Sequence, residues 1–212
     1  TFSSTAVTWI FSTKSKETES LSMNYASGVL VACAVMFIRV SVVAALFNVQ
    51  VLMWLLIPCL LMAVSAGGYA YYIIKTKTPK ADMINESIQL GNPLDLMNAA
   101  FFGLQYIAIT LAVYFANIYF GAKGLFISGI ISGFADVDAI NISASKLSLI
   151  QISPTMAAMV ILFAVISNTL FKIGECYIKG TRELFRQVVI GLILSIVIAG
   201  ISILFIYINQ TT

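Results

Sequence analysis

The sequence predicts an all-α fold: a polytopic bundle of transmembrane helices with interrupted helices and an internal repeat, favoured as inverted. The 212 residues are 60% hydrophobic and only 10% charged, with a mean hydropathy of +0.98, whereas about a quarter of a soluble domain is charged. No apolar/polar alternation is sustained over about ten residues, which argues against membrane strands. Two polar stretches inside the apolar chain supply the evidence for interruption and repetition.

Five apolar segments are each long enough to cross a bilayer, which takes about 20 residues. They cover residues 24–47, 51–74, 96–120, 156–178 and 188–208. Residues 76–95 form a long polar loop between the second and third segments, and we interpret this loop as a solvated connection. The chain is expected to form one integral membrane domain over residues 1–212.

Two stretches do not fit as ordinary spans. The first is TFSSTAVTWIFSTK at residues 1–14, and the second is KGLFISGIISGFADVDAINISASK at residues 123–146. The second contains about ten apolar residues, then Gly133, then a polar run. This pattern is typical of a helix interrupted at membrane depth, where non-helical backbone must be covered by protein or line a watery cavity.

An offset of 133 residues aligns rare polar positions of the two unusual stretches. The aligned pairs are Thr5 with Asp138, Thr8 with Asn141, Ser12 with Ser145, and Arg39 with Lys172. This coincidence predicts a duplication, with a first repeat over about residues 1–75 and a second over about 96–208.

The basic residues decide between inverted and parallel repeats. Lys14 and Lys16 precede the first span and Lys75 follows the second, so these charges share one face of the membrane. The later basic cluster at residues 179–186 lies on the same face only if residues 123–146 enter the membrane and return to the side from which they came, without crossing it. Because short cytoplasmic loops collect Lys and Arg, the count favours this re-entrant, inverted arrangement over a parallel one.

Arg39 and Lys172 are the cations placed deep in apolar segments, where a charge costs at least about 2.5 kcal/mol. Arg39 has no acid three or four residues away, so its partner must come from elsewhere, and Asp136 and Asp138 are the candidates. We prefer Asp138, because it aligns with Thr5. Lys172 lies nearer its segment's end, where it can reach an interface or pair with Glu175 one turn on.

These charges and the nearby oxygens form the candidate site. The expected ion- or substrate-binding residues are Asp136, Asp138, Asn141, Ser3, Ser4 and Thr5. Arg39 and Lys172 are the expected counter-charges, with Asn168, Thr169 and Glu175 in support. Two interpretations stay open: coordination of an ion or substrate, and a fixed salt-bridge network that holds broken helices together. The metal preference of the site is left open.

Other chemistry finds little support. The net charge of +3 is too small to indicate nucleic-acid binding, and the sequence has no histidine, nucleophile motif or glycine-rich phosphate loop. Three cysteines stand alone in apolar segments without metal-ligand spacing, and we interpret them as small residues that face lipid or the protein core. We therefore expect neither an enzyme nor a cofactor.

Several motifs resemble one family. The pattern Gly-x-x-Ser-Gly-Phe-Ala-Asp-Val-Asp-Ala-Ile at residues 129–140 is the most specific, and residues 3–6, 26–40 and 167–180 match as well. Together they are similar to a prokaryotic membrane domain of unknown function, often fused behind an MgtC/SapB-type membrane domain. The family usually has Thr where this chain has Asn141. The resemblance implies that an apolar segment before Ser3 is missing, and that an MgtC-like membrane domain is a partner.

The functional expectation has two forms. The first is a secondary transporter or ion-translocating protein in a prokaryotic cytoplasmic (inner) membrane, acting on a small ion or small molecule. The alternative is a non-transporting scaffold or regulatory module whose buried charges are structural. Partners are the lipid bilayer in both cases, and the oligomeric state is left open.

Overall fold

The computed structural model describes residues 4–76, 124–134 and 137–211, together with positions 107, 111, 115 and 119. The described secondary structure is helical and contains no strand, which confirms the all-α prediction. The helices are α1 (Ser4–Glu17), the 3₁₀ turn η1 (Glu19–Leu21), α2 (Ser22–Phe47), α3 (Val49–Thr76), α5 (Val137–Leu147), α6 (Pro154–Lys179) and α7 (Arg182–Thr211). A further short apolar helix spans Gly124–Phe134.

Four of these helices are long and apolar enough to cross a membrane. They are Glu19–Phe47, Val49–Thr76, Pro154–Lys179 and Arg182–Asn209, and they correspond to the first, second, fourth and fifth apolar segments of the sequence. At a rise of 1.5 Å per residue, each exceeds the roughly 30 Å thickness of the hydrocarbon core. The polar loop and most of the third segment lie outside the described residues.

Polar residues mark the starts of three long helices. The side chain of Asn48 accepts a hydrogen bond from the backbone N–H of Gln50 (2.9 Å), at the junction of α2 and α3. Thr181 accepts from the N–H of Leu184 (3.2 Å) at the start of α7, and Ser153 caps α6. Each bond satisfies an N–H that the first helical turn otherwise leaves without an acceptor.

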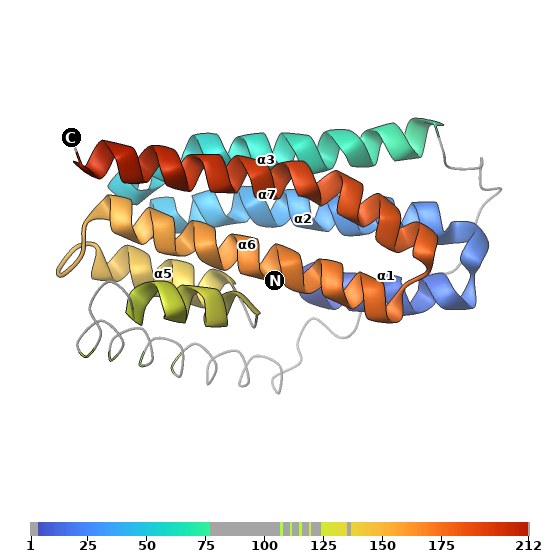
Figure 1. Ribbon diagram of the computed structural model, residues 1–212, viewed down its shortest axis with the longest axis horizontal. Coiled ribbons are helices and arrows are strands. Elements are labelled where there is room, and N and C mark those ends of the chain that lie inside the picture. Colours follow the sequence, from blue (N-terminus) through green and yellow to red (C-terminus); the bar gives the residue numbers. More distant parts are fainter. Residues whose placement is uncertain are drawn as a thin grey trace.

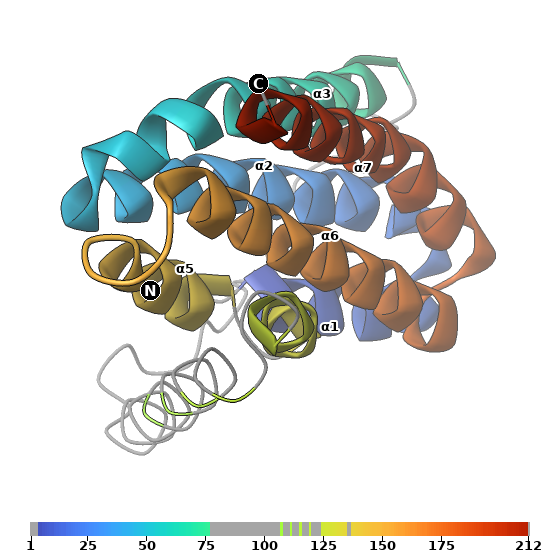
Figure 2. The ribbon, with the colours of Figure 1, turned by 60° about the vertical axis from the view of Figure 1, so that its left-hand side comes forward.

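The two short helices α1 and α5 pack on one layer of the bundle, formed by α2 and α6. Both lie below α2 in Figure 1, and Figure 2 again shows α5 below α2 and α6. Each packs on both long helices of this layer. α1 runs from the middle of the bundle towards the end where α6 finishes, because Lys16 contacts the carbonyl of Ile178. α5 runs the opposite way, since Ser148 beyond its end contacts Asn48 at the end of α2. Their N-termini therefore lie near the middle of the bundle.

The helix Gly124–Phe134 runs beside α6 in the direction opposite to α5. Ser167 of α6 donates to the carbonyl of Ile130 (2.7 Å), and Asn168 donates to the carbonyl of Gly133 (2.8 Å). The chain thus enters along α6 as far as the middle of the bundle, and α5 returns towards the end from which it came. This is the re-entrant arrangement that the basic residues favoured.

Small residues permit this close approach. A Cβ atom on Gly133 would overlap the carbonyl oxygen of Ala164 and lie 2.8 Å from the Cβ of Ser167. A Cβ on Gly129, one turn earlier, would lie 3.0 Å from the carbonyl oxygen of Val160. The Gly-x-x-x-Gly spacing lets helix backbones meet, as it does in many membrane interfaces.

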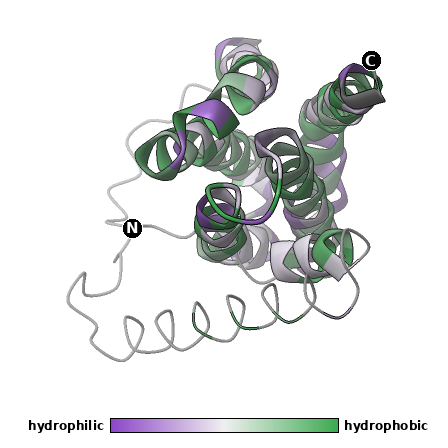
Figure 3. Ribbon diagram, turned by 90° about the vertical axis from the view of Figure 1, so that its left-hand side faces the viewer, coloured by the Kyte–Doolittle hydropathy of each residue, from purple (hydrophilic) through white to green (hydrophobic). Residues whose placement is uncertain are grey.

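Charge is concentrated at one end of the bundle. Lys14 and Lys16 lie in the last turn of α1, Lys75 in the last turn of α3, and Lys179 in the last turn of α6. A hydrogen bond of 2.8 Å from Tyr69 to Gln187 joins the α3 end to the start of α7. Elsewhere most of the described ribbon is apolar, as Figure 3 shows. The three basic groups of the sequence therefore share one end.

Replacing Gly133 with alanine is expected to destabilise the bundle by about 1–3 kcal/mol, because the added methyl group overpacks a backbone contact. For a chain of this size the loss corresponds to a lowering of Tm by roughly 2–4 °C per kcal/mol. Gly174→Ala is the matched control, since its Cβ would meet nothing within 4 Å. Thermal unfolding in detergent checks this, and equal Tm values for the two variants would contradict the packing argument.

The shared basic end predicts the sidedness of the chain in a membrane. Cysteines placed at Lys75 and Arg182, both exposed, should react with a membrane-impermeant maleimide from one side. A cysteine at exposed Gln151, between α5 and α6, should react from the other side. The native cysteines are buried and contribute little background. Labelling of positions 151 and 182 from the same side would rule out this topology.

Candidate functional site

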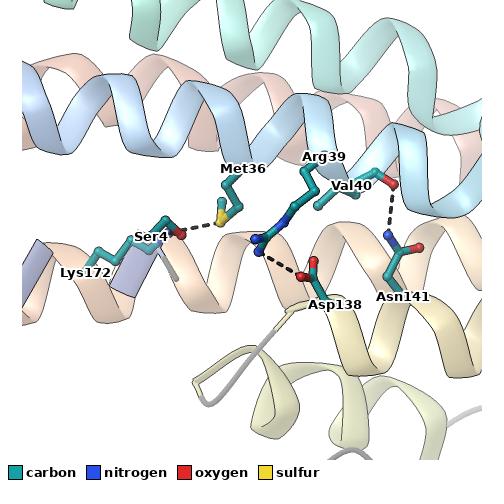
Figure 4. A network of polar contacts seen from close by, with 7 residues as sticks. All are labelled: Ser4, Met36, Arg39, Val40, Asp138, Asn141 and Lys172. Carbon is teal, nitrogen blue, oxygen red and sulfur yellow. Dashed lines mark hydrogen bonds and ion pairs between the residues drawn. The ribbon is translucent and has the colours of Figure 1, made fainter. Parts of the chain in front are cut away.

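A cluster of charged and polar side chains lies in the middle of the bundle, where the two short helices begin (Figure 4). Arg39 of α2 forms an ion pair with Asp138, with 2.9 Å between Nη2 and Oδ2. Asp138 is in the first turn of α5, where the helix dipole also stabilises a negative charge. The ion pair predicted from the sequence is therefore present. The side chains are 24% and 13% exposed, so the pair is partly accessible.

Lys172 occupies the corresponding position in the other half of the site. Its Nζ donates to Ser4 Oγ (2.7 Å) at the start of α1 and lies 2.9 Å from Met36 Sδ of α2. The residue is fully buried. The expectation that Lys172 reaches an interface is therefore wrong, because its side chain crosses to α1 inside the bundle.

The two halves are anchored in the same way. The cation of α2 binds the start of α5, and the cation of α6 binds the start of α1. The far ends repeat the relation: Asn48 donates to Ser148 Oγ (2.8 Å), and Thr181 donates its backbone N–H to Ser15 Oγ (3.1 Å). Ser15 and Ser148 are 133 residues apart, as are Asn48 and Thr181. The offset that aligns the sequence thus also relates the contacts.

Two amide side chains bond backbone carbonyl groups around the ion pair. Asn141 is fully buried and donates to the carbonyl of Val40 (2.9 Å), next to Arg39. Its Oδ1 accepts from Ser145 (3.3 Å). Asn168 donates to the carbonyl of Gly133, the last glycine of the entering helix. These bonds tie α5 to α2 and the helix Gly124–Phe134 to α6.

The remaining candidate residues divide into three groups. Thr169 is buried and donates to the carbonyl of Val165 within its own helix, and Thr5 is half-buried on α1. Glu175 is buried, but it forms no ion pair within the described part of the chain, so the expected pair with Lys172 is absent. Ser3 and Asp136 lie outside the described residues.

The electrostatics of the cluster favour negative charge. Two cations and the N-terminus of α5 lie in this cluster, and a helix N-terminus carries a partial positive charge. Asp138 supplies a carboxylate to one cation and Ser4 a hydroxyl to the other. Within the described residues no group of three or more His, Cys, Asp or Glu side chains is arranged to hold a metal ion.

Sequence reasoning missed several residues of this arrangement. Met36, Ser15, Ser148, Asn48 and Thr181 take part in the anchoring contacts but were not singled out. The sequence did contain a signal for four of them, because Ser15 aligns with Ser148, and Asn48 with Thr181, at the offset of 133 residues. Met36 gives no such signal, because one Met in an apolar helix resembles any other.

Comparison with known protein families places most of the chain in one family. The family described as "Domain of unknown function (DUF4010)" matches residues 1–180. The chain belongs to this family. It is also 33% identical over 186 residues to an "Uncharacterized protein" of Aquifex aeolicus (strain VF5), covering 86% of this chain and 79% of that protein. No solved structure matches.

A double-mutant cycle measures the Arg39–Asp138 pair. Arg39→Met or Asp138→Leu alone leaves one charge without its counterpart and should lower the free energy of unfolding by about 3 kcal/mol. This value is at the low end of the range for buried ion pairs because both side chains are partly exposed. The double variant should cost less than the sum of the two. Chemical denaturation in detergent micelles gives the three values, and strict additivity would show that the two charges do not interact.

Proposed function

We propose that this protein is a secondary transporter or ion-translocating membrane protein with its ion site at Asp138. The observation that carries the proposal is the Arg39–Asp138 pair, located where a short helix begins in the middle of an apolar bundle. Ionisable groups at such depth are costly and usually belong to ion or substrate pathways.

The coupling chemistry follows from competition for one carboxylate. A proton or small cation that binds Asp138 neutralises it and releases Arg39, whose charge then favours a different position of α5 relative to α2. An ion that binds one of two conformations more tightly shifts their equilibrium. Both side chains are partly exposed, at 24% and 13%, so the bundle does not fully enclose the pair.

The architecture supports the same conclusion by analogy. Transporters are often built from inverted repeats whose discontinuous helices meet near the membrane midplane. Here α5 begins in mid-bundle, α1 runs in the opposite direction to it, and cations at equivalent positions anchor both helices. An architectural analogy raises the expectation of transport but names no substrate.

The remaining expectations from the sequence form part of the proposal. The proposed location is the cytoplasmic membrane of a prokaryote, with the basic end on the cytoplasmic side. The proposed partners are lipid, a small ion or small-molecule substrate, and an MgtC-like membrane domain. Neither an enzymatic reaction nor a cofactor is part of the proposal.

A second candidate function is a non-transporting membrane scaffold. The polar contacts at the two far ends favour it, because they tie both short helices to the long ones at points remote from the ion pair. In that case the charges act as an internal clamp, and neutralising Asp138 lowers stability without abolishing any flux.

The experiment is charge movement by the protein in liposomes on a solid-supported membrane, under proton, cation and anion concentration jumps. The wild type should give a transient current that Asp138→Asn abolishes. Glu183→Gln is the control, because this acid is exposed and lies in the first turn of α7, outside the site. Full current in an Asp136→Asn, Asp138→Asn double variant would reject the site. Silence of folded wild type under every jump would favour the scaffold.

A further inference from the structure

Glu175 is a buried carboxyl group that the ion pair does not use. It is 8% exposed and lies on α6, one turn beyond Lys172 towards the basic end. Its Oε2 atom is buried and receives no hydrogen bond within the described part of the chain. Other buried polar groups of this helix, such as Thr169 and Lys172, do make hydrogen bonds.

An ionised carboxylate is costly in such a place. Burial of a charge without hydrogen bonds costs far more than burial of the neutral group, so a carboxyl group with a buried oxygen that lacks a donor favours the protonated form. The neutral form has fewer acceptor sites to satisfy. Glu175 therefore differs from Asp138, whose carboxylate is stabilised by Arg39 and by the start of α5.

The charged and titratable groups around Glu175 are few. Lys172 and Lys179, both on α6, act on it electrostatically. From the neighbouring helices, Lys16 of α1 reaches the carbonyl of Ile178, and the buried thiol of Cys33 on α2 acts on that of Cys176 beside Glu175. Lys172 is the cation of this set whose ammonium group binds a hydroxyl of another helix, that of Ser4 on α1.

We propose that Glu175 is a proton-binding site and that Lys172 controls it by exchanging between Ser4 and Glu175. With Lys172 on Ser4, as in the structure, the Glu175 carboxyl holds its proton. When Lys172 leaves Ser4 and turns to Glu175, an ion pair forms in place of the O–H bond and the proton departs to water. No other bond is made or broken. The part of this inference that concerns transport rests on the proposed function. It identifies the proton as the ion to which transport is coupled.

Such an exchange links protonation to the position of α1. Ser4 is in the first turn of α1, so loss of its contact with Lys172 removes the anchor of that helix in the middle of the bundle. Protonation of Glu175 returns Lys172 to Ser4 and restores the anchor. A proton entering from the basic end thereby selects between two arrangements of α1 and α6.

Infrared spectroscopy of the full chain in lipid vesicles tests the proton site directly. The measured signal is the carbonyl stretching band of a protonated carboxyl group, which disappears when the group loses its proton as the pH is raised. The wild type should show a band at neutral pH that Glu175→Gln removes and that Glu183→Gln and Asp138→Asn retain. Ser4→Ala frees Lys172 to approach Glu175, so it should move the loss of the band to lower pH. Lys172→Met removes the competing cation and should move it to higher pH.

The outcomes separate this inference from the transport proposal. A band that survives Glu175→Gln, or a titration that neither Ser4→Ala nor Lys172→Met moves, overturns the proton site. If Glu175→Gln keeps a proton-driven current that Asp138→Asn abolishes, transport stands and the coupling through Glu175 is wrong. If the band behaves as expected while no current appears, the proton site stands and the transport proposal fails.

Discussion

Two cations inside apolar helices impose the constraint on which the rest of this structure depends. Arg39 and Lys172 each lie far from their own helix ends and need oxygen partners at that depth. A short helix that begins in mid-bundle can offer its N-terminus there, as α5 does to Arg39 through Asp138. On the other side of the site, Ser4 of α1 supplies a hydroxyl to Lys172. The short helices therefore provide the partners that make the two cations tolerable at this depth.

Close packing makes this arrangement physically feasible. The entering helix ends beside α6 because Gly129 and Gly133 allow backbone contact, and Asn168 then satisfies a carbonyl group that the end of that helix exposes. Without a covering helix, such a carbonyl would face hydrocarbon, which membrane proteins avoid. Asn141 has a matching effect from α5, because it bonds the carbonyl of Val40 beside the arginine. Polar backbone at this depth is thus covered by protein on both sides.

Composition and pattern were enough to predict the helical class, four of the spans and the Arg39–Asp138 pair. The pair could be predicted because Arg39 has no acid within a turn and only a few acids lie at comparable depth. The partner of Lys172 could not, since Ser4 is one hydroxyl among many and an acid at Glu175 offered a nearer, wrong answer. Helical spacing places two side chains near each other, but it does not say which rotamer the surrounding helices leave open.

Divergence between the two halves argues for more than a clamp. A duplicated clamp needs only two equivalent anchors, and the far contacts at Ser15 and Ser148 have kept that equivalence. The central contacts have not: one half pairs a carboxylate with a partly exposed arginine, and the other joins a hydroxyl to a fully buried lysine. Arg39 is partnered by a carboxylate for which a proton or cation can compete, whereas Ser4 offers Lys172 only a hydroxyl. The two unequal centres therefore fit the proposed ion site at Asp138, and a duplicated clamp does not require them.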